Sequence, residues 1–200
     1  IAQAIARYGC AVRDCGDVRG PVNPDAPAVA GYRHLDEVVT WNRAVFQAVH
    51  DELTAGRLPL MMGGDHSLAI GSISAVARYC RERGRKLRIL WFDAHADFNT
   101  SAITPSGNLH GMPAACLCGF GPPALVELSG TVPAIGAGEI RQIGIRSVDE
   151  GEKRFLEEQG IEVFDMRYID EIGMRRTLEL ALAGVDEATH LHVSLDVDFL

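Results

Sequence analysis

The sequence predicts an α/β fold built on a mainly parallel central sheet. Strand-like and helix-like segments alternate along the 200 residues, the links between them are short, and the run LRILWF (87–92) is apolar except for Arg88, as in strands buried on both faces. A chain of this length can bury the core of one domain. We therefore expect a single domain over residues 1–200, cut from a longer protein at both ends, because the chain lacks an initiator Met and stops at a strand.

The elements of the first half follow from hydrophobic spacing. Residues 10–14 (CAVRD) favour a short strand, and residues 34–53 repeat apolar side chains every three or four positions, as on one face of a helix. The apolar run 58–62 (LPLMM) has the character of a strand and leads into the polar motif GGDHS. A helix is predicted over 67–83, and the buried strand 87–92 follows it.

The second half begins with a span rich in glycine and proline. Residues 99–138 are predicted to be mostly loop, with a short helix near 112–118. Strands and helices then alternate to the end of the chain. The predicted strands are 140–146, 161–166 and 189–198, and the predicted helices are 149–159 and 168–182.

Four polar motifs follow predicted strands at the point where each strand ends. They are GGDHS, DAHADFN, RSVDEGE and DVDF. Ligands of open parallel sheets collect beyond the carboxyl ends of the strands. The four motifs are therefore expected to form one site at one edge of the sheet.

Composition narrows the class of partner and the compartment. The chain has 27 acidic and 19 basic residues, for a net charge of −8, which disfavours nucleic acid and anionic membranes as partners. No stretch is apolar for long enough to span a membrane, and the first residues do not resemble a signal peptide. The five cysteines include no C-x-x-C pair, which suits reduced thiols in a cytoplasmic protein.

The motif DAHAD places two aspartates around a histidine at the end of the apolar strand. Side chains two apart in an extended segment point the same way, so Asp93, His95 and Asp97 are expected to converge. Buried carboxylates need a positive partner, and no Lys or Arg lies between Trp91 and Pro105. The sequence therefore predicts a bound cation.

The candidate metal ligands come from three separate segments. They are His66, Asp93, His95, Asp97, Asp196 and Asp198. Six ligands are too many for one tetrahedral zinc, but they suit two divalent ions that lie roughly 3.5–4 Å apart. A donor set of four carboxylates and two imidazoles favours manganese over zinc or copper.

Each motif taken alone also has a simpler interpretation. A lone His66 is typical of a capping or core residue, and a single D-x-D is as typical of a turn or helix cap. The start of DAHAD resembles a calcium loop but lacks the glycine and glutamate of an EF-hand. A phosphate site at GGDHS is disfavoured, because Asp65 would repel the anion and no lysine follows. The metal interpretation rests on the motifs occurring together.

The motifs also resemble those of a known enzyme family. The segments GGDHS, DAHADFN, SGNLHG, RSVDEGE and SLDVDF occur in the order found in the ureohydrolases, and the sequence resembles the arginases among them. The resemblance spans most of the chain. It implies a three-layer α/β/α fold, two Mn²⁺ ions per subunit and a homo-oligomer, either a homotrimer or a homohexamer.

The resemblance implies a role for each candidate ligand. One Mn²⁺ would be held by His66, Asp93, Asp97 and Asp196. The other would be held by His95, Asp93, Asp196 and Asp198, so that two aspartates bridge the ions.

The chemistry implied is hydrolysis of the guanidinium group of L-arginine to L-ornithine and urea by a metal-bridging hydroxide. Asp97 would carry a proton to the leaving amine, and His110 would exchange protons with solvent as an acid and base. Without the SGN that precedes it, His110 would be interpreted as a polar loop residue.

The resemblance also implies how the amino-acid end of the substrate is recognised. Asn99, Ser106 and Asn108 would bind the α-carboxylate, and Asp149 and Glu152 would bind the α-ammonium group. Agmatine has no carboxylate, so the presence of the carboxylate-binding residues favours arginine as the substrate. The alternative is an agmatinase, or another ureohydrolase that acts on a related guanidino or formimino compound.

A second alternative is a non-catalytic binding protein that retains the fold. It predicts the loss of a metal ligand or of His110, and all of these residues are present.

One feature of the sequence departs from the family pattern, and one residue of that pattern is expected outside the sequence. The loop after Cys116 is longer and richer in glycine and proline than expected, and the family's guanidinium-binding glutamate would lie beyond Leu200.

Overall fold

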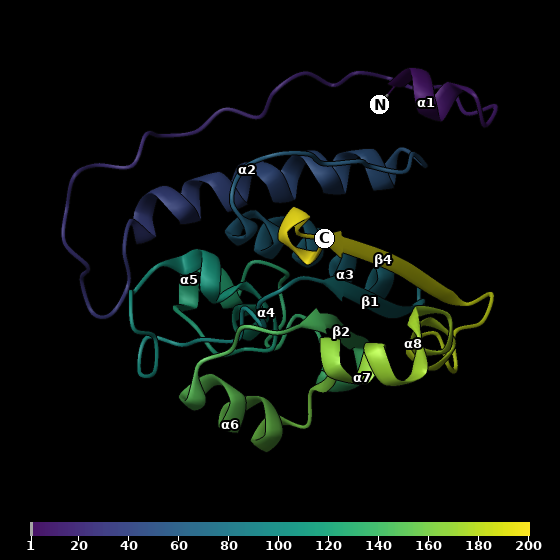
Figure 1. Cartoon of the computed structure of the whole chain (residues 1–200). Coiled ribbons are helices and arrows are strands. Elements are labelled where there is room, and N and C mark those ends of the chain that lie inside the picture. The colour runs from purple at the N-terminus through teal and green to yellow at the C-terminus, as the bar shows by residue number, and fades with distance from the viewer. Residues whose placement is uncertain (1) are drawn as a thin grey trace.

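The computed structural model describes residues 2–200 and confirms an α/β fold with a parallel sheet. The strands are β1 (Lys86–Phe92), β2 (Ile140–Ile145), β3 (Glu162–Asp165) and β4 (Thr189–Leu195). They lie in the order β3-β2-β1-β4, and every pairing between neighbours is parallel. Figure 1 shows the helices wrapped around this small sheet.

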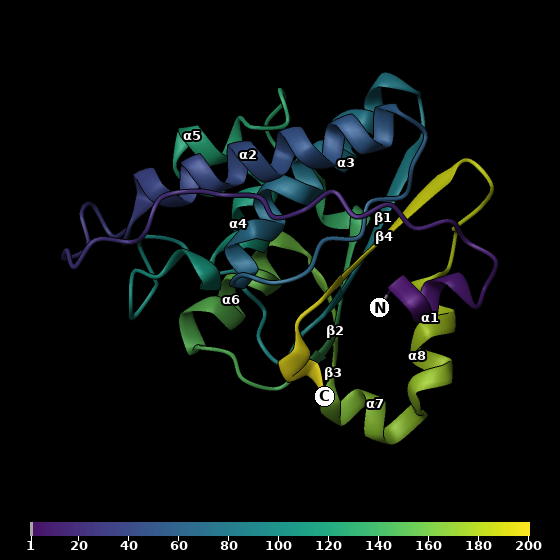
Figure 2. The same cartoon turned by 90° about the horizontal axis from the view of Figure 1, so that it is seen from above.

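Helices cover both faces of the sheet and form the three layers that the family resemblance implies. Alternate side chains of β1 point to opposite faces, so Ile89 and Trp91 join a core cluster with helices α2 (Leu35–Thr54) and α3 (Ala69–Glu82). Leu90, on the other face, joins a second cluster with α7 (Met166–Ile172) and α8 (Met174–Ala181). The view from above in Figure 2 separates the two helical layers.

The remaining helical segments are short or lie between the strands. They are α1 (Ala2–Ala6), α4 (Pro113–Leu117), α5 (Pro123–Val126), α6 (Glu150–Gln159), α7 (Met166–Ile172), α8 (Met174–Ala181) and the 3₁₀ turns η1 (His66–Leu68), η2 (Leu109–Gly111), η3 (Ala137–Glu139) and η4 (Val197–Phe199). Within residues 2–200, no helix has the length and apolar character needed to cross a membrane.

Two predicted strands are wrong. Residues 10–14 and 58–62 form no strand in the described part of the chain, and Leu58 and Met62 are largely exposed. An apolar, β-leaning segment becomes a strand only when a neighbouring strand satisfies its backbone groups. Neither segment has such a neighbour within residues 2–200.

The prediction of one continuous helix over 168–182 is also wrong, because two helices occupy this segment. It is divided into α7 and α8 at Gly173, which has a positive φ of 82°. Helical backbone requires a negative φ, so the helix ends there and a new one begins at Met174. The strand predicted over 189–198 ends at Leu195, and η4 follows it. The other long helices and strands lie close to their predicted bounds.

The register of β1 and β4 positions the polar motifs. Trp91 is paired with Ser194 and Phe92 with Leu195, so the two strands end side by side. The segments that follow them therefore start at the same edge of the sheet, as the sequence predicts.

Candidate metal centre

The paired ends of β1 and β4 bring the two aspartate motifs together. The backbone N–H of Asp196 donates to the carbonyl of Phe92 at 2.9 Å, which extends the pairing one step past the strands. Asp93 follows directly and is almost fully buried. Asp97, four residues later, is also buried and has a left-handed backbone conformation with φ of 50°. Strain of this kind in a residue other than glycine is frequent at functional sites.

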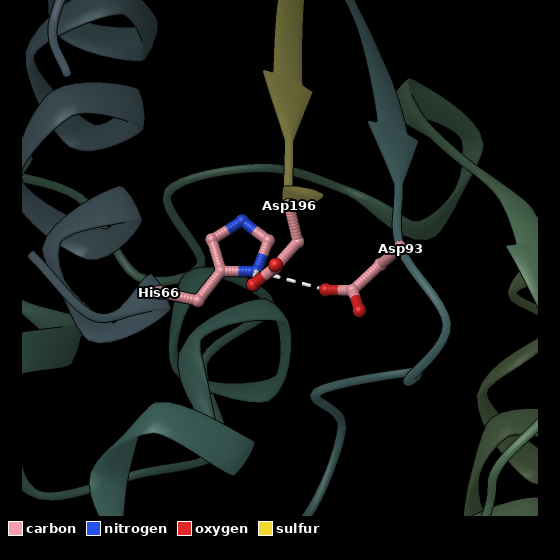
Figure 3. A group of neighbouring side chains, drawn as sticks. All are labelled: His66, Asp93 and Asp196. Carbon is pink, nitrogen blue, oxygen red and sulfur yellow. Dashed lines mark hydrogen bonds and ion pairs between the residues drawn. The ribbon is translucent and has the colours of Figure 1, made fainter. Parts of the chain in front are cut away.

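His66 reaches the same place from the turn η1. The Asp65 side chain caps this turn by accepting the N–H of Ser67 at 3.0 Å. The His66 Nδ1 atom lies 2.8 Å from Asp93 Oδ2, 3.0 Å from Asp97 Oδ2 and 3.5 Å from Asp196 Oδ2. In Figure 3 the imidazole points at Asp93 and Asp196, which extend from two different strands.

A second group of side chains adjoins the first. His95 Nδ1 lies 3.1 Å from Asp198 Oδ2 and 3.5 Å from Asp93 Oδ1. Asp198 is held in turn by the N–H of Ala94, which donates to its Oδ1 at 3.1 Å. This group is more open to solvent, since the His95 side chain is 52% exposed.

Asp93 belongs to both groups. His66, Asp93 and Asp196 each offer a ligand atom within 4.8 Å of the others, and so do Asp93, His95 and Asp198. One carboxylate oxygen faces each histidine, which is the arrangement of a carboxylate that bridges two cations. We call His66, Asp93 and Asp196, with Asp97 beside His66, the inner group, and Asp93, His95 and Asp198 the outer group. All six residues that the sequence singles out lie in these two groups, each of which could hold a metal ion.

The electrostatics of the inner group are those of a cation site. Burial raises the pKa of Asp97 to about 7, although the hydrogen bond from His66 opposes the shift. Burial lowers the pKa of His66, but its hydrogen bonds to Asp93 and Asp97 raise it more, to about 9. Burial thus disfavours the charged form of the Asp97 carboxylate, and a divalent ion beside it would stabilise that charge.

Two residues inside the strands support the inner group, and sequence reasoning missed them. The indole of Trp91 donates to Asp93 Oδ2 at 3.1 Å, and its ring stacks on the His66 imidazole with centroids 4.1 Å apart. The Ser194 Oγ lies 2.9 Å from His66 Nε2. A signal was present for Ser194, because it precedes Asp196 by two and so points the same way on β4.

Arg146 supports the outer group in a similar way. Its guanidinium donates to the backbone carbonyl of Asp198 and, at 3.2 Å, to that of Phe199. The Phe199 ring lies against Gly144, where an added Cβ would come within 2.4 Å of the ring. Contacts from β2 and the residue after it therefore hold the segment that carries Asp198.

The expected carboxylate-binding residues lie in the segment that leads from Asp97 to η2. Asn99 is buried, and its Nδ2 lies 3.5 Å from Asp149 Oδ2. Ser106 accepts the N–H of Asn108 at its Oγ, 3.2 Å away. His110 is exposed in η2 and lines a cavity of about 200 Å³ together with Asn108.

Asp149 and Glu152 form the N-terminus of α6. Glu152 is buried, its Oε1 accepts the N–H of Phe98 at 2.7 Å and its Oε2 accepts the N–H of Asp149 at 3.4 Å. Burial raises the pKa of this carboxyl group. Glu152 therefore links the loop after β1 to α6, which is a structural function beside the substrate contact expected from the sequence.

Comparison with known proteins gives one consistent family. The model of the arginase family matches residues 2–200. The arginase of Bacillus caldovelox is 44% identical over 169 residues, which cover 84% of this chain and 55% of that protein.

Solved structures agree with this result. The native structure of Bacillus caldovelox arginase has a TM-score of 0.88 and 38% identity, covering 97% of this chain and 64% of that one. Entamoeba histolytica arginase in complex with L-ornithine has a TM-score of 0.80 and 32% identity, covering 90% of this chain and 60% of that one. The chain thus spans less than two thirds of the length of these relatives.

Proposed function

The chain belongs to the arginase family, and we propose that the protein is an arginase that hydrolyses L-arginine to L-ornithine and urea with two Mn²⁺ ions. The observation that carries this proposal is the position of Asp93 between two groups of candidate ligands. A bridging carboxylate is typical of centres with two metals. The oxygen-rich donor set, with one imidazole in each group, supports manganese over zinc.

When bound, two divalent ions would lower the pKa of a coordinated water enough to supply hydroxide near neutral pH. The imidazole of His66 would use Nδ1 toward its ion, which leaves the proton on Nε2. Ser194 Oγ, 2.9 Å away, is placed to accept that proton's hydrogen bond and to fix the ring. Trp91 would orient the bridging carboxylate of Asp93 in the same manner.

Two residues are proposed to move protons. Asp97 lies beside His66 in the inner group, where it would carry a proton to the amine that leaves with ornithine. His110 is exposed in η2, which packs against the turn η1 that carries His66, and there it would exchange protons with solvent. Buried and exposed positions suit these two tasks, since only the second requires contact with water.

The amino-acid end of arginine is proposed to lie among the loop residues. Ser106 accepts a hydrogen bond from Asn108, so its own hydroxyl hydrogen is free to bind a carboxylate, and the amide of Asn99 is a second donor. Asp149 and Glu152 are acidic partners for the ammonium group. Glu152 already accepts two backbone hydrogen bonds, but a carboxylate has about four acceptor sites. The relative solved with L-ornithine supports a ligand of this shape.

We also propose a cytoplasmic location and a homotrimeric or homohexameric assembly. All five cysteines are free, which supports a reducing compartment. The assembly rests on the family resemblance.

The substrate is tested by incubating the Mn²⁺-loaded protein with L-arginine or with agmatine and measuring urea. We expect urea from arginine, and much less from agmatine, because agmatine leaves the carboxylate-binding groups without a partner. A protein that released urea only from agmatine would be an agmatinase, and the substrate proposal would be wrong.

A further inference from the structure

A tight turn ahead of α2 lies against the loop that carries Ser106 and Asn108. Val29 and Tyr32 exchange backbone hydrogen bonds of 2.8 and 3.0 Å. The two central residues, Ala30 and Gly31, both have positive φ values of 52° and 82°. This is the pattern of a type I′ turn, which is a well-defined structure and fixes the direction of the chain that leaves it.

The turn and the loop approach each other without space for side chains. A Cβ added to Gly31 would lie 2.8 Å from the Cβ of Ser101, so only glycine fits there. A Cβ added to Gly107 would lie 3.2 Å from the carbonyl oxygen of Gly31, and Gly107 itself has a positive φ of 74°. The turn at Gly31 is therefore in close contact with the loop at two places, Ser101 and Gly107.

Arg33 leaves this turn and binds two successive carbonyls of the loop. Its backbone N–H donates to the carbonyl of Gly107 at 2.8 Å, and its Nε–H donates to the carbonyl of Ser106 at 3.0 Å. The loop also has an internal support, because the Thr104 hydroxyl accepts the N–H groups of Ser106 and Gly107. Backbone on each side of the Ser106 side chain is thus held in place.

We propose that Arg33 is a positioning residue for recognition of the substrate's α-carboxylate. By holding the carbonyls of Ser106 and Gly107, it fixes the direction of the Ser106 hydroxyl and of the Asn108 amide. This inference rests on the proposed function, which assigns those two side chains to the carboxylate. A displacement of about 1 Å in such groups is enough to weaken binding.

The test compares Arg33→Ala and Arg33→Lys with the wild type, with Arg43→Ala as a control. Arg43 is an exposed arginine on α2, near Arg33 in the sequence. For each protein, kcat and KM are measured with L-arginine and with agmatine, and bound Mn²⁺ is counted. In Arg33→Ala we expect KM for arginine to rise about tenfold, with kcat changed less than about twofold. The reason is that the carbonyl of Ser106 loses the charged donor that holds it.

The agmatine reaction and the metal content should not change, because neither uses the carboxylate-binding groups. Arg33→Lys should resemble Arg33→Ala, because lysine keeps the charge but cannot place a donor where Nε–H lies. An unchanged KM for arginine, an equal loss with agmatine, or wild-type behaviour of Arg33→Lys would each overturn the proposal.

Hydrogen exchange separates this inference from the proposed function. The amides of residues 104–110 should exchange faster in Arg33→Ala than in the wild type or Arg43→Ala. If the wild type releases no urea from arginine, the proposed function fails whatever the exchange result. If urea is released but exchange at 104–110 is unchanged, the positioning by Arg33 is wrong.

Discussion

At the residue scale, the site depends on side chains that hold Asp93 and His66 in fixed directions. Trp91 contacts both, through a hydrogen bond of 3.1 Å to the carboxylate and a stacked ring over the imidazole. It is fully buried, so its position is set by the core and not by solvent. The orientation of the inner group is therefore built into β1.

Replacing Trp91 with Phe should weaken metal binding while the fold is retained. Phenylalanine keeps a ring beside His66 but cannot donate to Asp93, and the loss of such a supporting hydrogen bond lowers metal affinity by about 10–100-fold. Competition with a chelator measures the change. Trp41→Phe is the matched control, because the Trp41 indole donates to the carbonyl of Pro21 at 2.8 Å and not to either metal group. Equal affinity in the wild type and Trp91→Phe would contradict this role.

The metal ligands that the sequence predicted are side chains of types that bind metals directly, whereas Trp91 and Arg146 act only through contacts with those ligands or with their backbone. Asp93 and Asp97 are charged residues next to an apolar strand, so their residue type and position in the sequence indicate metal binding. Trp91 looks like any core aromatic, and Arg146 looks like a surface charge. Their contacts depend on the three-dimensional register of β1, β2 and β4, which a single sequence does not specify.

At the element scale, the N-terminus of α6 depends on one buried carboxylate. Glu152 connects Phe98 to the first turn of the helix through two hydrogen bonds. The bond from the N–H of Asp149 at the N-cap to the side chain of Glu152 is one of the two contacts of a capping box. Glu152 also joins the loop after β1 to the loop after β2.

Glu152→Ala should therefore lower stability as well as substrate affinity. The buried N–H of Phe98 would lose its acceptor, at a cost of about 1–3 kcal/mol, and the helix would lose its cap. Thermal unfolding measures the change in Tm. Glu150→Ala is the control, since Glu150 is exposed in the same helical turn. A Tm equal to that of the wild type would show that the hydrogen bonds to Glu152 contribute nothing.

Hydrophobic spacing predicted the elements that pack against neighbouring elements and failed at the exposed residues 58–62. The helix 34–53 and the strand 87–92 are buried by neighbours and lie near their predicted bounds. Residues 58–62 have the same apolar character but are exposed, and they form no strand. The break at Gly173 was missed because a single glycine in a periodic segment does not reveal the sign of its φ.

At the scale of the whole molecule, three layers hold the polar edge in place. Segments from η1, β1, β2 and β4 and the residues that follow these strands meet there, and each contributes either a candidate ligand or a residue that supports one (Figures 1 and 3). In the part of the chain that the structure describes, none of the six candidate ligands pairs with a Lys or Arg side chain. Metal binding and folding should therefore be coupled.

Mn²⁺ should raise the Tm of the protein, and removal of the ion by a chelator should lower it. A ligand that binds only the folded state at 100 times its dissociation constant adds about 2.7 kcal/mol of stability. The measurement is a thermal melt at increasing Mn²⁺ concentration. Mg²⁺ is the comparison, and we expect a smaller effect because it accepts imidazole ligands poorly. A Tm independent of Mn²⁺ would contradict the coupling.

The most direct test of the account is the number of Mn²⁺ ions bound per chain in the wild type, Asp93→Ala and His110→Ala. We expect two ions in the wild type and none in Asp93→Ala, because that substitution removes the carboxylate common to both groups. His110→Ala should turn over slowly but retain two ions. Elemental analysis after dialysis gives the count. Two ions retained by Asp93→Ala would show that this carboxylate does not link the two groups.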